Sequence, residues 1–252
     1  MLKLRVIPTL LYRDFGLVKG VGFDSWRPVG SAMQAVKVYN MREVDELVFL
    51  DIRATADERP PDFAIVDELA DECFMPMTVG GGVRSVDDAR RLLQVGADKV
   101  AVGAAAAERP QLVREIAERF GAQCVVVSID VRRPGGGPGE ACIRAGTRPT
   151  GKEPVAFAQE MESLGAGEIL LQSIERDGTM EGYDLELIRR VSDAVSIPVI
   201  ASGGAGNYDH LAGAVLDGHA SAVAAASIFH FTQQTPLEAK RHLAGKGIAV
   251  RL

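Results

Sequence analysis

Cysteines are few in this sequence, and long apolar runs are missing. The three cysteines, Cys73, Cys124 and Cys142, are an odd number without the spacing of a metal site. This favours a reducing cytoplasm over an oxidising compartment. We expect Cys124, which lies in an apolar run, to be a buried hydrophobic residue. No run reaches the roughly 20 apolar residues of a membrane span, and the N-terminal "MLKLRVIP" lacks the apolar core of a signal peptide.

An excess of positive charge is also missing. The formal net charge is −6 and the pI is about 5.3, which argues against a surface that binds nucleic acid. Histidines are equally scarce, and His210, His219, His230 and His242 do not have the spacing of metal ligands. We define no Cys–His or Ser–His–Asp set, and we expect neither a metal nor a cofactor.

Short apolar runs alternate with amphipathic segments along the whole chain. The runs are too apolar to have one wet face, which is typical of parallel strands covered on both sides. Helical patterns such as Val86–Gln94, Pro110–Phe120 and Leu185–Val195 lie between them. Eight such units in 252 residues predict a (β/α)₈ barrel. The expected strands are Leu4–Leu11, Glu46–Ile52, Met75–Val79, Lys99–Val102, Cys124–Asp130, Glu168–Ser173, Pro198–Ser202 and Ala220–Ala225.

An internal repeat favours the barrel over an open doubly wound sheet. The stretch from Met75 to Ala105 aligns without gaps with the stretch from Ile197 to Ser227 at a shift of 122 residues. A repeat of this length indicates a duplicated supersecondary unit. We therefore predict a single barrel domain built from two half-barrels, at about 1–122 and 123–252.

Small residues follow the strands at matching places in the two halves. Glycine lets the backbone approach an anion closely, and two such loops at one barrel mouth suit a ligand with two phosphates. Tight turns alone are the alternative explanation, and the duplication favours phosphate binding. The candidate phosphate-binding residues are Gly81, Gly82, Gly103, Ala104, Gly203, Gly204, Ala226 and Ser227.

Carboxylates and a lysine lie at the same expected mouth. Asp130 and Asp51 end apolar strands, where each acts either as a general acid or base or as a cap of the following loop. Lys19, in the first loop, either folds over a phosphate as part of a lid or is a solvated surface residue. Asp177 and Thr179 belong to a further polar loop, which we expect to bind substrate.

Four charged residues stand at the opposite ends of the strands. Arg5, Glu46, Lys99 and Glu168 each begin a strand, so they are expected to form a ring at the bottom of the barrel. Two acids and two bases pair evenly, as buried charges must. Such a ring either stabilises the barrel or gates a passage through it.

Several motifs resemble one family along essentially the whole chain. They are "TVGGGVRS", "GADKVAVGAAA", "CVVVSID", "GAGEILLQSIERDGT", "IPVIASGGAGN" and "GIAVRL", and they are similar to the cyclase subunit of imidazole glycerol phosphate synthase, an enzyme of histidine biosynthesis. The resemblance implies a lyase or cyclase fed with ammonia by a glutaminase docked on the barrel bottom. It also implies that the four-residue ring is the ammonia gate, that Asp98 lies at the glutaminase contact and that Lys19 is the lid lysine.

One catalytic position departs from that family. Its members use two aspartates, on the first and fifth strands; Asp130 matches the second, but Leu11 stands where the first is expected. Leucine transfers no proton, and losing a positioned acid or base typically costs about 10²–10⁴-fold in rate. The stretch "SAMQAVKVYNMREVDELVFLDI" is similar to a paralogous branch with this departure. That branch is associated with glutaminases and with an ATP-dependent ligase that forms amides or amidines in surface-sugar pathways.

Three hypotheses follow from this resemblance. The first is an ammonia-channelling subunit of a heterodimeric glutamine amidotransferase, acting on or supplying ammonia for a phosphorylated or nucleotide-linked sugar. The second is a genuine imidazole glycerol phosphate synthase subunit in which Asp14 or Asp51 replaces the missing acid. The third is a non-catalytic scaffold that activates a glutaminase. The insert Arg132–Ala141 resembles a flexible lid beside Asp130.

Overall fold

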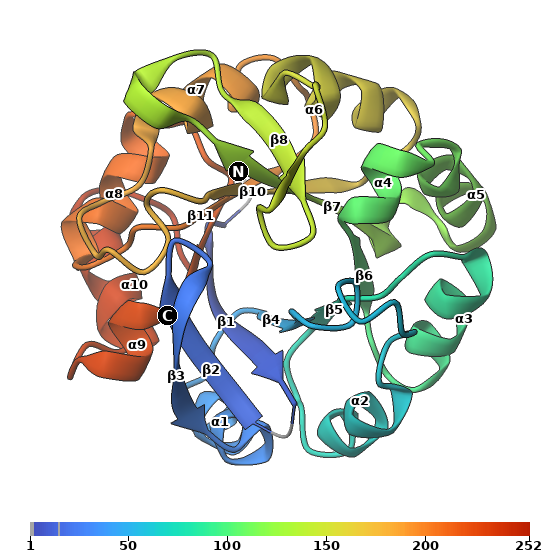
Figure 1. Ribbon diagram of the computed structural model, residues 1–252. Coiled ribbons are helices and arrows are strands. Elements are labelled where there is room, and N and C mark those ends of the chain that lie inside the picture. The colour runs from blue at the N-terminus through green and yellow to red at the C-terminus, as the bar shows by residue number, and fades with distance from the viewer. Residues whose placement is uncertain (1–2, 15) are drawn as a thin grey trace.

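Eight parallel strands close into a barrel at the centre of the computed structural model, which describes residues 3–14 and 16–252 (Figure 1). The start of the segment "MLKLRVIP" lies outside the described residues. The barrel closes where Ile169 pairs with Val127, so the predicted (β/α)₈ fold is confirmed. The barrel strands, in order, are β1 (Arg5–Arg13), β4 (Leu47–Asp51), β5 (Met77–Gly80), β6 (Lys99–Val102), β7 (Val125–Arg132), β10 (Glu168–Ser173), β11 (Val199–Ser202) and β12 (Ala222–Ala225).

Helices surround the barrel and cover its outer face (Figure 1). No helix of the described residues is long and apolar enough to cross a membrane. The helices are α1 (Ala32–Met41), α2 (Phe63–Ala70), α3 (Val86–Gln94), α4 (Ala104–Glu108), α5 (Gln111–Phe120), α6 (Pro154–Ser163), α7 (Leu185–Ser192), α8 (Tyr208–Leu216), α9 (Ser227–Phe231) and α10 (Pro236–Gly245).

The internal repeat is visible in the element boundaries. Helices α1, α2 and α3 become α6, α7 and α8 at both ends when 122 is added, and β5 becomes β11 in the same way. The short extra helices α4 and α9 also follow equivalent strands, β6 and β12. The repeat read from one part of the sequence therefore extends over most of the barrel, while the boundary between the half-barrels stays a prediction.

Two hairpins extend the barrel at its mouth. Strands β2 (Gly16–Val21) and β3 (Asp24–Gly30) follow β1, and β8 (Glu140–Ile143) and β9 (Arg148–Pro149) follow β7. The sequence did not predict them, and the expected strand ends at Leu11 and Asp130 were each two residues short. The insert after Arg132 includes a 3₁₀ turn (Pro134–Gly136) that returns the chain into β8.

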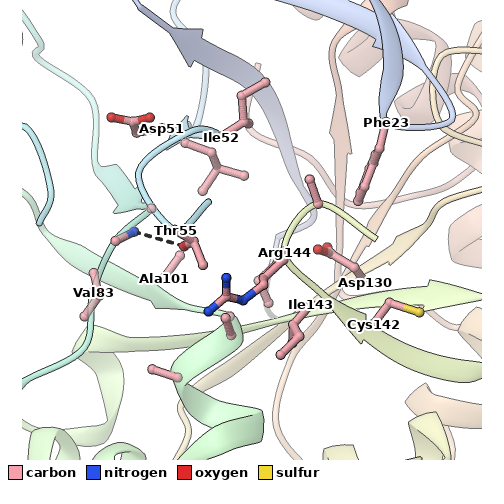
Figure 2. A pocket seen from close by; sticks show the side chains of 18 of the residues that line it. Phe23, Asp51, Ile52, Thr55, Val83, Ala101, Asp130, Cys142, Ile143 and Arg144 are labelled. Atoms are coloured by element: carbon pink, nitrogen blue, oxygen red, sulfur yellow. Dashed lines mark hydrogen bonds between the residues drawn. The ribbon is translucent and has the colours of Figure 1, made fainter. Parts of the chain in front are cut away.

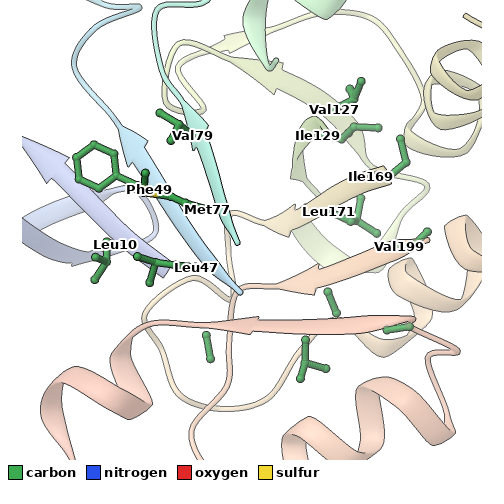
Figure 3. Close-up of a cluster of buried hydrophobic side chains, with 14 of the residues drawn as sticks. Leu10, Leu47, Phe49, Met77, Val79, Val127, Ile129, Ile169, Leu171 and Val199 are labelled. Carbon is green, nitrogen blue, oxygen red and sulfur yellow. The ribbon is translucent and has the colours of Figure 1, made fainter. Parts of the chain in front are cut away.

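Alternation along the strands divides the apolar residues into two clusters. Side chains such as Phe49, Met77 and Leu171 point outward and pack under the helices (Figure 3). The smaller cluster, which includes Val48 and Leu170, fills the barrel interior. The expectation for Cys124 was wrong: it is half-buried in the 3₁₀ turn Ala122–Cys124, because the chain turns there between α5 and β7.

Candidate functional site

The bottom of the barrel holds the four charges expected there. Arg5 Nη1 lies 2.6 Å from Glu46 Oε2 and 3.1 Å from Glu168 Oε1. Lys99 Nζ lies 3.0 Å from Glu46 Oε2 and 3.1 Å from Glu168 Oε1. Thr78 Oγ1 also donates to Glu46 Oε1 at 2.8 Å. Acids and bases therefore alternate in a closed ring, in which each charge has two partners of opposite sign.

Above this ring the interior is apolar and then becomes polar again. Because strand side chains alternate, each inward position two residues further on lies one layer higher. The middle layer, which spans two successive inward positions of β12, is Ile7, Val48, Ala101, Val126, Leu170, Ile200, Ala222 and Ala224. The inward residues above it include Ser128 of β7, Gln172 of β10 and Ser202 of β11, with Asp130 of β7 one layer higher than Ser128, so hydrogen-bonding groups meet at the carboxyl ends of the strands.

A pocket of about 370 Å³ opens at this end (Figure 2). Leu11 and Asp130 both line it, as do Phe23 and Trp26 of the first hairpin and Arg144 of the second. The two hairpins therefore add aromatic and cationic side chains to walls that the barrel strands supply. Asp51, Gly81, Gly82, Gly103 and Ala104 of the predicted site also line this pocket.

Asp130 has the protonation behaviour expected of a general acid or base. Its strand places it beside Cys142 of β8 and Gln172 of β10. Burial, with a further contribution from the Asp177 charge, raises the pKa of Asp130 to about 7, while a hydrogen bond with Ser128 opposes the shift. A carboxyl that titrates near neutral pH can both accept and donate a proton there.

Leu11 occupies the corresponding position in the first half. It pairs with Val18 of the hairpin strand β2 as Asp130 pairs with Cys142 of β8. It also pairs with Leu50 of β4 on its other side. The position equivalent to Asp130 is therefore apolar in the structure as well as in the sequence.

Asp51 is held by its own loop. Its Oδ1 accepts from the backbone N–H groups of Arg53 and Ala54, each at 3.1 Å, and its Oδ2 lies 2.7 Å from Arg59 Nη1. Oδ1 thus has backbone donors and Oδ2 has an ion-pair partner, although Oδ2 accepts no hydrogen bond from the described residues, and Asp51 is only 5% exposed. This arrangement favours the loop-capping explanation for Asp51 over a role in proton transfer.

Lys19 is buried on β2 and binds Asp177. Its Nζ lies 2.7 Å from Asp177 Oδ2 and donates to the carbonyl of Gly20 at 2.9 Å. Gln172 Nε2 donates to Asp177 Oδ1 at 3.0 Å, and Gln172 Oε1 accepts from Ser202 Oγ at 2.6 Å. Burial raises the pKa of Asp177, while Lys19 and Gln172 oppose the shift. The first hairpin is therefore fastened to the opposite half of the barrel.

The second-half glycine loop lines a separate cavity of about 30 Å³ next to this ion pair. Gly203, Gly204, Ala226 and Ser227 surround it. Ser227 Oγ and Thr9 Oγ1, which lines the same cavity, are buried without a hydrogen-bond partner in the part of the chain that the structure describes. A buried hydroxyl without a partner is costly, and a phosphoryl oxygen in this cavity would satisfy both.

The glycines of the loops are required by close backbone contacts. A Cβ on Gly81 would lie 2.2 Å from the carbonyl oxygen of Asp51, and one on Gly203 would lie 2.7 Å from that of Ser173. Both glycines have positive φ angles, 104° and 88°. The matching contacts show that the two loops are built alike, and they explain these glycines whether or not phosphate binds.

Two predicted residues lie away from the pockets. Thr179 closes a turn by donating to the carbonyl of Arg176 at 2.9 Å, and it lines neither pocket. Asp98 lies at the opposite end of the barrel, where its Oδ2 accepts from the Met77 N–H at 2.8 Å. Asp98 is exposed beside the charged ring, at the end where a docked partner was expected.

Several residues of the site were missed by the sequence analysis. Ser128 and Gln172 stand at the inward positions of β7 and β10, and the two-residue period of the strands would have identified them. Phe23, Trp26 and Arg144 come from the hairpins. Nothing in the local pattern of the sequence indicates that these segments fold back over the mouth.

The architecture and the site together define a duplicated (β/α)₈ barrel with a polar pocket at the carboxyl ends of its strands, the usual place of an active site in this fold. Comparison with protein families makes the assignment more specific. The model of the family described as "Histidine biosynthesis protein" matches residues 5–235, and the chain belongs to this family. The members of this family are enzymes, isomerases and cyclases.

Proposed function

We propose that this barrel is the ammonia-using or ammonia-conducting subunit of a glutamine amidotransferase, and that it serves a phosphorylated or nucleotide-linked sugar other than the histidine-pathway intermediate. The observation that carries this proposal is the unequal pair in the pocket, Asp130 on β7 and Leu11 on β1. One residue that titrates near pH 7 remains, and its counterpart cannot exchange a proton.

The interior of the barrel supports a passage for ammonia. The middle layer contains no charged residue, and three of its eight members are alanine. An apolar surrounding disfavours the charged form of an amine, so ammonia would cross this layer as neutral NH₃. The alternating ring around Glu46 and Lys99 would be the gate at its lower end, where a small rearrangement of paired side chains opens the way.

The lower surface supports a docked glutaminase. Met41 is 78% exposed and Phe74 is 83% exposed. Both stand at the barrel bottom, where the Phe74 N–H donates to Asn40 Oδ1 at 3.1 Å. Exposed apolar side chains that lie together in a patch are a usual mark of a protein interface. An ATP-dependent ligase that takes the ammonia would be a second partner.

A direct assay separates this function from its rivals. The purified protein, supplied with ammonium salt and the ribulose-type substrate of the histidine pathway, is expected to form no imidazole product. Turnover like that of a two-aspartate cyclase would refute the proposal in favour of the histidine-pathway enzyme. Gain of imidazole formation by Leu11→Asp would support it, because the rest of the site would then be competent.

A second measurement addresses the scaffold alternative. A glutaminase subunit is mixed with the barrel, and glutamine hydrolysis is followed with and without Asp130→Asn. We expect the glutaminase to be stimulated by the wild-type barrel, and ammonia transfer to the sugar acceptor to require Asp130. If the Asp130→Asn variant still transfers ammonia fully, the barrel only conducts ammonia and does not use Asp130 in catalysis.

A further inference from the structure

Arg144 presents an unpaired donor to the pocket. Its Nε is buried and has no hydrogen-bond partner among the described residues, although the residue lines the pocket. Figure 2 shows the guanidinium pointing into the pocket towards Thr55 and Ala101. Within residues 3–14 and 16–252 its one ion-pair partner is Glu58, at 3.5 Å from Nη2, and the Glu58 side chain is 70% exposed. A guanidinium held in this way is available to a second acceptor.

The backbone that carries Arg144 is fixed in an unusual conformation. Arg144 and Ala145 both have φ angles of 54°, which residues other than glycine rarely adopt. The turn is held because Thr147 Oγ1 donates to the Arg144 carbonyl at 2.7 Å and Arg132 Nη2 donates to the Gly146 carbonyl at 3.0 Å. Strain that the surroundings maintain is a usual sign of a functional position.

The first glycine loop itself offers few side chains that would bind an anion, and Arg84, just beyond it, lines the pocket but is exposed. Gly103 and Ala104 carry no polar side-chain atoms, and the Gly82 N–H makes only a 3.4 Å hydrogen bond to Thr55 Oγ1. Several acids stand around the pocket, including Glu58 and Asp130. An oxyanion placed here needs a cation to offset this charge.

We propose that Arg144 is the specificity-determining residue of this pocket and binds a phosphoryl or carboxylate group of the ligand against the first glycine loop. Nη2, and Nε once the side chain rotates to expose it, form the fork that holds two oxygens of such a group. The ligand's oxyanion displaces Glu58 from Nη2. This inference rests on the proposed function in that it assigns an anionic ligand to the same pocket.

The single tryptophan of the chain, Trp26, lines the same pocket and reports binding by its fluorescence. Inorganic phosphate, pyrophosphate and acetate are titrated separately into the full chain at low ionic strength. We expect Arg144→Gln to weaken binding of the preferred anion at least about tenfold, as loss of a charge-assisted contact does. Tighter binding of phosphate than of acetate would identify a phosphoryl group, and the reverse a carboxylate.

Matched variants make the result specific. Arg241→Gln, which removes an exposed arginine of α10 that lines neither pocket, should leave binding unchanged. Glu58→Gln should tighten binding, and Arg144→Lys should weaken it, because lysine lacks the fork. Equal binding by the folded Arg144→Gln variant, or no saturable response of the wild type, would overturn the inference.

The outcome is separable from that of the proposed function. Anion binding that requires Arg144, in a barrel that neither stimulates a glutaminase nor transfers ammonia, would leave this inference standing without the proposed function. If Arg144→Gln transfers ammonia undiminished and binds the anion with unchanged affinity, the proposed function stands and this inference is wrong.

Discussion

Lys19 and Asp177, 158 positions apart in the sequence, form a buried ion pair with 2.7 Å between Nζ and Oδ2. Only 2% of Lys19 and 4% of Asp177 is exposed. The pair joins the first hairpin to the loop after β10, so it fixes one side of the mouth and adds a negative charge near Asp130. Lys19 therefore has a structural partner as well as its expected role as a lid residue.

Removing Lys19 should destabilise the fold strongly. Lys19→Met leaves a buried carboxylate without its cation, and we expect a loss of about 3–5 kcal/mol in the free energy of unfolding near pH 8. The loss should be smaller at pH 5, because without Lys19 the already raised pKa of Asp177 rises further and the group binds a proton. Urea unfolding at both pH values checks this, and Lys19→Met/Asp177→Asn should recover part of the loss.

Asp130 should make the protein less stable as the pH rises. Its pKa is about 7 in the folded state and about 3.9 in an unfolded chain, so its stabilising contribution is complete below about pH 4 and is lost by about pH 7. Asp130→Asn removes this dependence. We expect the variant to gain stability on the wild type between pH 5 and 8, by up to about 4 kcal/mol.

Asp177→Asn provides the control for that titration. Because the Asp177 charge contributes to the raised pKa of Asp130, the substitution should lower that pKa. Carboxyl-carbon NMR of the folded variant measures it directly. An unchanged Asp130 titration would show that burial alone sets the value.

The charged ring should be sensitive to the loss of one acid. Glu46 is 1% exposed and serves Arg5, Lys99 and the Thr78 hydroxyl at once. Glu46→Ala should cost about 3–5 kcal/mol, because it leaves the two partly buried cations, Arg5 and Lys99, with one acid between them. Denaturant unfolding measures this, and Glu118→Ala, an exposed acid on α5, should change stability by less than about 0.5 kcal/mol.

The second glycine loop should not tolerate a side chain. Gly204 has a φ angle of 115°, and a Cβ there would lie 2.1 Å from the Gly182 carbonyl oxygen. Gly204→Ala should therefore lose at least about 1–3 kcal/mol of stability. Gly245→Ala in α10, with no atom within 4 Å of the added Cβ, should be neutral or stabilising. Thermal unfolding of the two variants makes the comparison.

The sequence predicted what depends on local pattern. Apolar strands, the repeat and the inward position of Asp130 follow from periodicity, and the ring around Glu46 follows from strand starts. It did not predict that Arg144 reaches the pocket, because that depends on a hairpin turn in a strained conformation. It also did not predict the Lys19–Asp177 pair, because a single sequence contains no signal for a contact between distant loops. Thr179 failed to line the site because its hydroxyl is used within its own turn.

The duplication has a consequence for the direction in which a ligand lies. A mouth formed from two similar halves is nearly symmetric, and a ligand with an anionic group at each end would then fit in two reversed ways. The difference between Leu11 and Asp130, together with the contribution of Arg144 to one side only, removes this equivalence. If Arg144 binds an oxyanion as proposed, such a ligand would be held in one orientation, with the same end presented to the carboxyl group of Asp130.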